Sequence, residues 1–237
     1  MEWIDEGFVL SARRHGEGDL VLSLLTREHG RHAGLVKGGA GRRSAGLYEP
    51  GNRLRAVWRA RLSDHLGNFA CESLAQSAAA LLDEPLRLAA LTSAAAVAEA
   101  ALAEREPHPR AYDGFRALIE TLVTSGDTIA WAVRYVRWEL DLLAEIGFGL
   151  DLQNCAVTGE TVGLAFVSPN TGRAVSAGAA EPFRERLLAL PAFLTGGAAD
   201  LPGITQGLAL TGWFLERHAF RTVPPARARL VARLQRA

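Results

Sequence analysis

Hydrophobic and polar positions alternate along the first 80 residues, and this pattern predicts strands. Short apolar or alternating runs lie at residues 7–12 (GFVLSA), 19–26 (DLVLSLLT) and 32–36 (HAGLV), separated by the turn-prone HGEG and REHG. Period-two alternation is clearest in 53–62 (RLRAVWRARL), where Leu54, Ala56, Trp58, Ala60 and Leu62 share one face. Four or five short strands in about 75 residues predict a small antiparallel barrel or sandwich.

The pattern changes from about residue 76 onward to one typical of helices. Residues 77–104 predict two helices around Pro85, and 110–125 predict another. The clearest helix covers 128–146, with Asp127 as N-cap and Gly147 as stop. Its stripe of Trp131, Tyr135 and Trp138 is expected in the core, with a peptide groove as the alternative if part of it is exposed. Further helical runs open at Pro182 and cover about 204–220 and 225–236.

Charge is distributed unevenly, although the whole chain of 237 residues has a formal net charge of zero. Residues 37–61 carry seven basic residues against one acidic residue, Glu49, for a net charge of +6. Residues 35–51 (LVKGGAGRRSAGLYEPG) combine three of these cations, Lys37, Arg42 and Arg43, with small residues. This composition predicts a flexible basic loop whose backbone amides can approach phosphates.

The arginines of 53–62 form the strongest signal. Residues two apart on a strand lie roughly 6.6 Å apart on one face. Arg53, Arg55, Arg59 and Arg61 therefore predict a row of guanidinium groups, interrupted at Val57 and without an acid in the segment. Beside the basic loop, such a row is typical of a track for a nucleic-acid backbone. The alternative is the solvated face of an ordinary antiparallel strand.

Other chemistry is poorly supported by the motifs. KGGAGRRS is not a nucleotide-binding P-loop, because its lysine precedes the glycines. The pair His29 and His32 could bind a metal, but a turn between two strands is the favoured interpretation. Cys71 is expected in the core rather than as a nucleophile. We find no HExxH, no GxSxG and no paired acid–base motif, and we expect a protein that is not an enzyme and needs no cofactor. The apolar runs and the acidic start MEWIDEGFVL lead us to expect neither a membrane span nor a signal peptide.

Residues 148–180 predict a glycine-rich insertion of strands and turns that is similar to a zinc ribbon. The expected frame, C-x2-C followed by a second C-x2-C, falls here on Cys155, Thr158, Ser176 and Ala179. A structural zinc ion needs four Cys or His ligands, and this frame offers one. We therefore expect a ribbon-like fold without a metal. With only Cys71 and Cys155 in the chain, a reduced cytoplasmic environment is the default expectation.

Three segments carry a resemblance to a known family. They are GFVLSARRHGEGDLVLSLLTREHGRHAGLVKGGAGRRS, YEPGNRLRAVWRAR and CAVTG…FVSPNTGRAVS. In this order and spacing, the chain resembles the RecO family of bacterial DNA repair proteins over essentially its whole length. The resemblance implies an α+β fold: an N-terminal antiparallel OB-fold barrel in residues 1–79, a mostly helical domain in 80–237, and within it the insertion 148–180, which is metal-free in some members.

The resemblance also implies a function without catalysis. RecO-type proteins bind single- and double-stranded DNA and anneal complementary strands. With RecR they help load RecA onto DNA coated by the single-stranded-DNA-binding protein SSB, whose C-terminal tail they also contact. A cytoplasmic, nucleoid-associated protein is expected. The DNA-binding residues are expected in the first domain: Arg13, Arg14, Lys37, Arg42, Arg43, Arg53, Arg55, Arg59 and Arg61.

Two other functions remain open from the residues alone. One is an OB-fold adaptor that binds proteins and contacts no nucleic acid. The other is an enzyme that uses the glycine-rich loop to hold a phosphorylated substrate, for which no base or nucleophile can be named. Sparse aromatic residues favour binding that is electrostatic, salt-sensitive and weakly sequence-selective. Phe8, Tyr48, Trp58 and Phe69 are the candidates for stacking, although Trp58 shares the apolar face of its strand.

Overall fold

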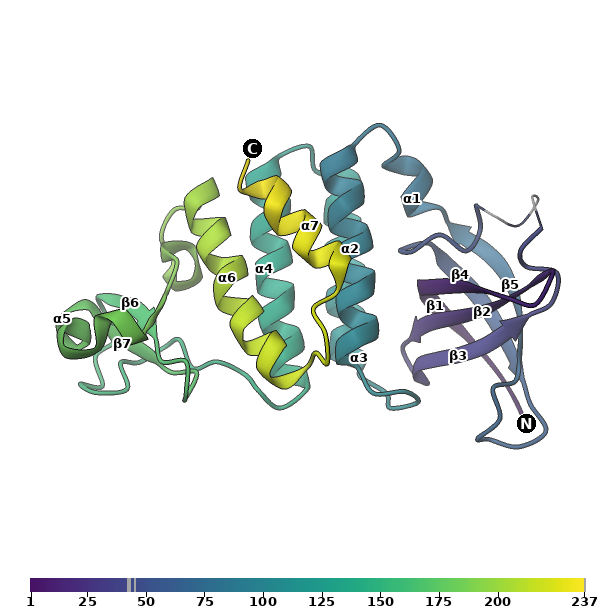
Figure 1. Ribbon diagram of the computed structural model, residues 1–237, viewed down its shortest axis with the longest axis horizontal. Helices are drawn as coiled ribbons and strands as arrows, with labels where there is room; N and C mark the ends of the chain where they lie inside the picture. Colours follow the sequence, from purple (N-terminus) through teal and green to yellow (C-terminus); the bar gives the residue numbers. More distant parts are fainter. Residues whose placement is uncertain (42–43, 45, 237) are drawn as a thin grey trace. The chain divides into compact units, whose positions relative to one another are not determined.

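A closed five-stranded barrel forms the N-terminal part of the computed structural model, which describes residues 1–41, 44 and 46–236 (Figure 1). Its strands are β1 (Glu2–His15), β2 (Asp19–Thr26), β3 (Gly30–Val36), β4 (Arg53–Arg59) and β5 (Asn68–Ala75). They are hydrogen-bonded in the order β1-β2-β3-β5-β4, and β1 also pairs with β4 to close the barrel. This is the small Greek-key barrel expected of an OB-fold, so the predicted α+β fold class is confirmed.

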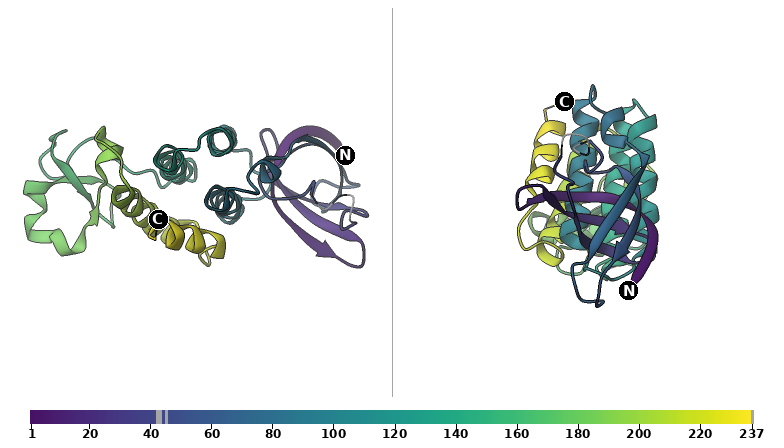
Figure 2. Two further views of the ribbon diagram at one scale, coloured as in Figure 1. Left: turned by 90° about the horizontal axis from the view of Figure 1, so that it is seen from above. Right: turned by 90° about the vertical axis from the view of Figure 1, so that its right-hand side faces the viewer.

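The first strand is longer than the sequence predicted, because it serves two neighbours. Residues 2–8 pair with β4, and residues 7–15 pair with β2. A register shift between Val9 and Ser11 bends the strand between these two partners. Its curved path can be followed in purple in Figure 2. Residues 2–6, which lie outside the predicted runs, therefore become one wall of the barrel.

The barrel interior follows the predicted alternation. Leu54, Ala56 and Trp58 of β4 are buried, as are Leu22 and Leu24 of β2. The predicted strand 53–62 ends earlier, at Arg59, and Leu62 is exposed. The apolar face of β4 therefore stops where the chain leaves the sheet, and the following loop turns Arg61 and Leu62 into solvent.

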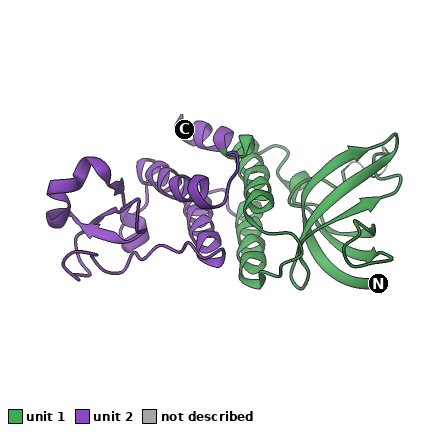
Figure 3. Ribbon diagram, turned by 60° about the horizontal axis from the view of Figure 1, so that its bottom comes forward, with its two compact units in different colours: residues 1–124, 224–227 green, residues 125–223, 228–237 purple. Residues whose placement is uncertain are grey.

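Three helices belong to the same compact unit as the barrel, shown in green in Figure 3. They are α1 (Ser77–Ala80), α2 (Pro85–Ala101) and α3 (Pro109–Thr124). The unit comprises residues 1–124 with 224–227, and residues 125–223 with 228–237 form the second unit. The compact units thus divide at residue 124, because α2 packs against β1 and β2 and the α2–α3 connection contacts the barrel. A division of the chain into domains 1–79 and 80–237 stays a prediction.

The connection between α2 and α3 is held against the barrel by a close backbone approach. Gly30 at the start of β3 has φ 64°, and a Cβ there would lie 2.0 Å from the carbonyl oxygen of Glu106. The backbone N–H of Arg105 donates to the carbonyl of Arg31 over 2.7 Å. Glycine is required at position 30 both by the left-handed backbone and by this contact.

The second unit is built around α4 (Thr128–Glu145) and α6 (Leu201–His218). Asp127 caps α4 as predicted, accepting hydrogen bonds from the backbone N–H groups of Ile129 and Ala130. Gly207 brings α6 close to α4, since a Cβ there would lie 2.9 Å from Val136. No described helix has the length and apolar character needed to cross a membrane.

The predicted insertion forms a three-stranded sheet in the order β7-β6-β8. Its strands are β6 (Leu164–Val167), β7 (Ala174–Ser176) and β8 (Leu188–Ala189), so the sheet extends beyond residue 180. Cys155 is buried in its small core with Val175 and Ala180. The remaining elements are α5 (Ala177–Ala180), the short 3-10 helices η1 (Glu181–Arg186) and η2 (Ala192–Thr195), and α7 (Pro225–Leu234).

Candidate nucleic-acid interface

The strand β4 directs its arginines to the outer surface of the barrel, as the alternation predicted. Arg55 and Arg59 are exposed, and Arg53 is half-buried. We call these three residues the β4 arginine row. Because β4 lies between β1 and β5, the side chains of both neighbouring strands flank the row on the same face.

Each arginine of the row is paired with a glutamate from an adjacent strand. Arg59 Nη2 lies 2.9 Å from Glu2 Oε1, and Arg55 Nη1 lies 3.8 Å from Glu72 Oε2. Arg53 is hydrogen-bonded to Glu6. The hydrogen bond from Arg59 lowers the pKa of the Glu2 carboxyl, so this carboxylate is charged at neutral pH. The three glutamates Glu2, Glu6 and Glu72 are hereafter the counter-carboxylates.

The expectation of an acid-free row is therefore wrong in its electrostatics. Three arginines are paired with three glutamates, so the formal charges of these six side chains sum to zero. The reason is the register: Glu6 is opposite Arg55 on one side, and Glu72 is opposite it on the other. Contact of Arg53, Arg55 and Arg59 with DNA stays a prediction.

An apolar row separates the charged rows on this face. Ile4, Val57 and Ala70 are directly opposite one another in β1, β4 and β5. Ile4 is 55% exposed, and Ala70 is also exposed. A face with mixed charges around an apolar row has the composition of a protein-binding surface as much as that of a phosphate track.

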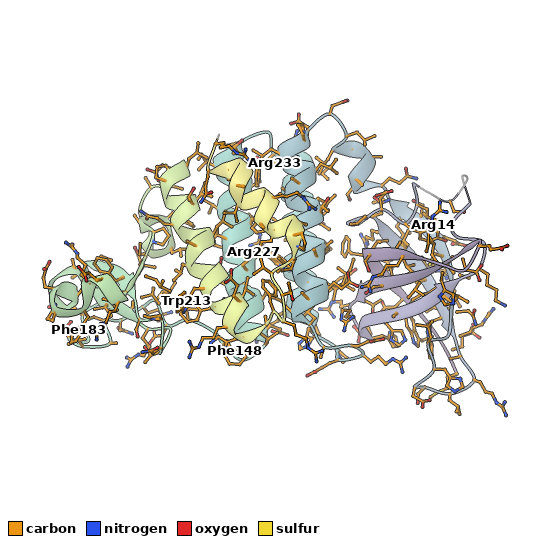
Figure 4. All side chains as sticks on the ribbon, viewed as in Figure 1. Arg14, Phe148, Phe183, Trp213, Arg227 and Arg233 are labelled. Atoms are coloured by element: carbon orange, nitrogen blue, oxygen red, sulfur yellow. The ribbon has the colours of Figure 1, made fainter. Side chains whose placement is uncertain are left out.

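A second basic region lies at the other end of β1, near the turn to β2. Arg14 and Lys37 are both exposed there (Figure 4 labels Arg14). Arg14 is opposite Leu20 of β2, and Leu20 is opposite Val36 of β3, so the two cations project from the same end of the barrel. We call Arg14 and Lys37 the basic rim.

Backbone hydrogen bonds fix the loop that follows Lys37 against the β1–β2 turn. The N–H of Gly38 donates to Asp19 Oδ1 over 2.8 Å, and the N–H of Ala40 donates to the carbonyl of Gly18 over 3.0 Å. This loop continues to Arg42 and Arg43, which lie outside the described residues. Glu17 and Asp19 are the acidic residues of the β1–β2 turn and the start of β2 at this end of the barrel.

Arg13 and Arg61, two further residues predicted to contact DNA, lie in surroundings that the sequence did not indicate. Arg13 Nη2 lies 2.8 Å from Glu99 Oε1 of α2, so its charge is compensated by the helical part of the unit. Arg61 is exposed, but it lies in the β4–β5 loop rather than on the strand. Neither residue extends the β4 arginine row.

The four aromatic candidates for stacking are all buried. Phe8, Trp58 and Phe69 are 2%, 2% and 5% exposed, and Tyr48 also lies in the core. Trp3 precedes the first predicted run and is not among the candidates named from the sequence. Its ring is parallel to that of His29, with centroids 4.1 Å apart, and parallel to that of Trp58 at 5.7 Å. The signal that could have found Trp3 is the apolar–polar alternation EWIDE at the start of the chain.

The histidines of EHGRH have separate roles. Residues 27–29 form a turn between β2 and β3, as favoured by the sequence, and His29 Nδ1 lies 3.1 Å from Asp5 Oδ2. His32 is buried beside Trp58, and burial lowers its pKa to about 4. Within the part of the chain that the structure describes, no group of three His, Cys, Asp or Glu side chains is placed to hold a metal ion.

The pKa values of the two cysteines are shifted in opposite directions. Burial raises the pKa of Cys71 to about 12, which fits its predicted place as a core residue rather than a nucleophile. Burial also raises the pKa of Cys155, but hydrogen bonds from Ser176 and Thr158 offset this and lower it to about 6. The Ser176 N–H donates to Cys155 Sγ over 3.3 Å. Three positions of the predicted ligand frame thus contact one another, with a single sulfur among them.

The aromatic stripe of α4 lies in the hydrophobic core of the helical part of the chain. Trp131, Tyr135 and Trp138 are each 1% exposed, so the alternative of a peptide groove there is wrong. The exposed aromatic residues lie elsewhere in the second unit: Phe148, Phe183 and Trp213 (Figure 4). The arginines of the C-terminal segment differ in burial: Arg227 is only 4% exposed, whereas Arg229, Arg233 and Arg236 are exposed.

Comparison with known proteins covers the whole chain. Residues 1–77 match the model of the Recombination protein O N-terminal domain, and residues 82–227 match that of the Recombination protein O C-terminal domain. A DNA repair protein RecO of Rhodospirillum centenum is 55% identical, over 100% of this chain and 96% of its own length. Those of Rhodospirillum rubrum and Phenylobacterium zucineum are 49% and 50% identical, over 100% of this chain and 97% and 99% of theirs. With both domain models in order and relatives of this identity over the full length, the chain belongs to the RecO family of DNA repair proteins.

Proposed function

We propose that the chain is a DNA-binding recombination mediator without catalytic activity. In this proposal it binds single- and double-stranded DNA and anneals complementary strands. With RecR it helps load RecA onto single-stranded DNA coated by SSB, and it contacts the C-terminal tail of SSB. A cytoplasmic, nucleoid-associated protein is part of the same proposal. Membership of the RecO family over the full length is the observation that carries it.

The basic rim is proposed as the first site of contact with the phosphate backbone. Arg14 and Lys37 are exposed, and no ion pair engages either of them among the described residues. They stand beside a glycine-rich loop that continues to Arg42 and Arg43. A cation without a carboxylate partner can neutralise a phosphate and release its counterion without first breaking an ion pair. This supports the basic rim, rather than the β4 arginine row, as the dominant contact.

The β4 arginine row and Arg61 are proposed as secondary contacts, and Arg13 likewise. A phosphate that binds Arg55 or Arg59 must either displace the paired carboxylate, Glu72 or Glu2, or share the guanidinium group with it. Exposed ion pairs of this kind contribute little stability, so a phosphate can replace the carboxylate, but the net gain in affinity per arginine is smaller.

The test is a titration of labelled single-stranded DNA, followed by fluorescence anisotropy between about 50 and about 200 mM salt. Replacing both Arg14 and Lys37 by alanine is expected to weaken binding and to reduce the slope of log K against log salt by about 1.4. The matched variant replaces Arg55 and Arg59 by alanine, which removes the same formal charge, and is expected to have the smaller effect. Binding that is absent at low salt in the unmodified protein would refute the proposed function.

An OB-fold adaptor that binds proteins but not DNA is the second candidate, and one observation favours it. The outer face of β1, β4 and β5 has a neutral charge balance around the row of Ile4, Val57 and Ala70, in which Ile4 and Ala70 are exposed and Val57 is half-buried. The same titration separates the two functions, because an adaptor shows no salt-dependent retention of DNA at any salt concentration.

A further inference from the structure

A hollow of about 370 Å³ opens beside the end of the barrel where β1 begins and β4 ends. It lies within one compact unit, at the opposite end of β1 from Arg14 of the basic rim. Its walls include four aromatic rings, those of Trp3, His29, His32 and Trp58. The remaining lining comes from the chain start, the β2–β3 turn, the β4–β5 loop and the α2–α3 connection: Met1, Glu2, Glu28, Ser63, Arg105 and Pro107.

The rings are arranged as parallel plates with one perpendicular member. Trp3 is within 17° of parallel to both His29 and Trp58. His32 is nearly perpendicular to Trp3, at 83°, and to Trp58, at 75°. Parallel rings at one edge of a hollow favour a further planar ring over a branched aliphatic group, because stacking requires flat faces.

His32 adds hydrogen-bonding capacity that the described residues leave unused. It is 5% exposed, and neither of its ring nitrogens has a hydrogen-bond partner among them. Buried polar atoms are nearly always paired, so two unpaired nitrogens in the wall of a hollow mark a place for a ligand with donors and acceptors. The neutral imidazole offers one donor and one acceptor.

The β4–β5 loop that closes one side is held in place by Arg105. This residue has φ 64°, uncommon for a residue other than glycine, and its guanidinium donates to the carbonyls of Ser63 and His65, the latter over 2.8 Å. The hollow is thus formed before any ligand arrives, which lowers the entropic cost of binding.

The chemistry of the lining selects a nucleobase rather than a phosphate. Glu2 and Glu28 at the opening disfavour an anion inside the hollow, whereas flat rings with a donor and an acceptor suit a heteroaromatic base. The hollow has the size of a small ligand site, and the β4–β5 loop is one of the two loops with which OB-folds bind oligonucleotides. The exposed Arg59 and Arg61 lie at the end of β4 and in the following loop, close in sequence to Trp58 and Ser63 of the lining.

We propose that the hollow lined by Trp3, His29 and His32 binds one unstacked nucleobase of single-stranded DNA. This rests on the proposed function, because the base is delivered by a strand that the rest of the barrel holds through its phosphates. It adds to that function a contact that is insensitive to salt, in contrast to the basic rim.

The experiment compares two oligonucleotides with the same number of phosphates, one carrying bases and one base-free. Ser63→Phe places a ring into the hollow from an exposed position of the lining. Leu62→Phe is the matched control, since it adds a ring at the exposed neighbouring position outside the lining.

The unmodified protein and Leu62→Phe are expected to bind the base-free strand roughly tenfold or more weakly than the strand with bases. In Ser63→Phe this ratio is expected to fall toward one, while affinity for the base-free strand is unchanged. Equal binding of the two strands by the unmodified protein overturns the base site but leaves DNA binding intact. If Ser63→Phe leaves the ratio unchanged, the base site is not in this hollow. If the unmodified protein binds neither strand, the proposed function itself is refuted.

Discussion

Acid should destabilise the barrel through His32, and the variant that tests this is His32→Phe. The imidazole is buried between Trp3, Trp58 and Phe69, which meet it edge to face. Burial lowers its pKa from the ordinary 6.5 to about 4. Arg105 and His29 lower it further, because a positive charge near them is unfavourable.

The sign and the size of the effect follow from this pKa difference. The unfolded chain takes up a proton near pH 6.5 and the folded barrel only near pH 4, so stability is complete above 6.5 and decreases as the pH falls. The whole difference of 2.5 pKa units corresponds to about 3 kcal/mol in the free energy of unfolding. Roughly 2 kcal/mol of this is lost by pH 5, because the unfolded imidazole is then almost fully protonated.

Urea unfolding of the unmodified protein and of His32→Phe, at about pH 8 and about pH 5, measures the effect. Phenylalanine keeps an aromatic ring of similar size in the same cluster but cannot be protonated. The difference between the two proteins should therefore change by about 2 kcal/mol between these pH values, in favour of the variant at low pH. An NMR titration of the His32 ring provides a direct check. The reasoning is refuted if the two proteins lose stability equally, or if His32 titrates near 6.5.

Three other predictions concern charge, backbone and metal. Changing all three counter-carboxylates to glutamine should strengthen binding of single-stranded DNA and steepen its salt dependence by up to about 2 in log–log slope; an unchanged slope would mean that the β4 arginine row does not contact DNA. Gly30→Ala should destabilise the protein by more than about 2 kcal/mol in urea unfolding, since it combines a left-handed backbone with a steric clash, whereas Gly16→Ala, with the same backbone but open space around it, should cost about 1 to 2 kcal/mol. The purified protein should contain far less than one zinc ion per chain, because the ribbon frame has only the thiol of Cys155; stoichiometric zinc in elemental analysis would contradict this.

The barrel was largely predictable because its signals are local. Alternation in 53–62 identified the buried face of β4, and glycine-containing turns separated the strands on either side. The start of β1 was not predicted, because residues 2–6 have exposed and half-buried side chains and become a strand only through pairing with β4. The α4 helix was predicted with its cap, since Asp127 and the apolar periodicity are both encoded within a few turns.

The charge balance around the β4 arginine row was not predictable from the segment 53–61 that carries these arginines. Between Arg53 and Arg61 the sequence contains no acid, yet Glu2 and Glu6 lie about 50 positions earlier in the chain and reach the row through strand pairing. The same holds for Trp3 and His29, which stack across a separation of 26 positions. The buried stripe of Trp131, Tyr135 and Trp138 on α4 shows the converse case, in which periodicity alone indicated a core position.

By itself, the sequence determined most strands of the barrel, the helix α4, their apolar faces, and the family to which the chain belongs, because these properties are encoded in residue periodicity, turn residues and motif order. It did not determine the start of β1, and the helical run expected from Pro182 is a short 3-10 helix followed by β8. The tertiary structure decided which charges neutralise one another and which rings meet. Strand register places charged side chains from distant segments within 4 Å of one another. At that distance their Coulomb attraction is strong, and no pattern within a single segment reveals which partner it meets. The basic strand therefore has a balanced charge on the folded barrel, and the aromatic hollow exists only because the barrel closes.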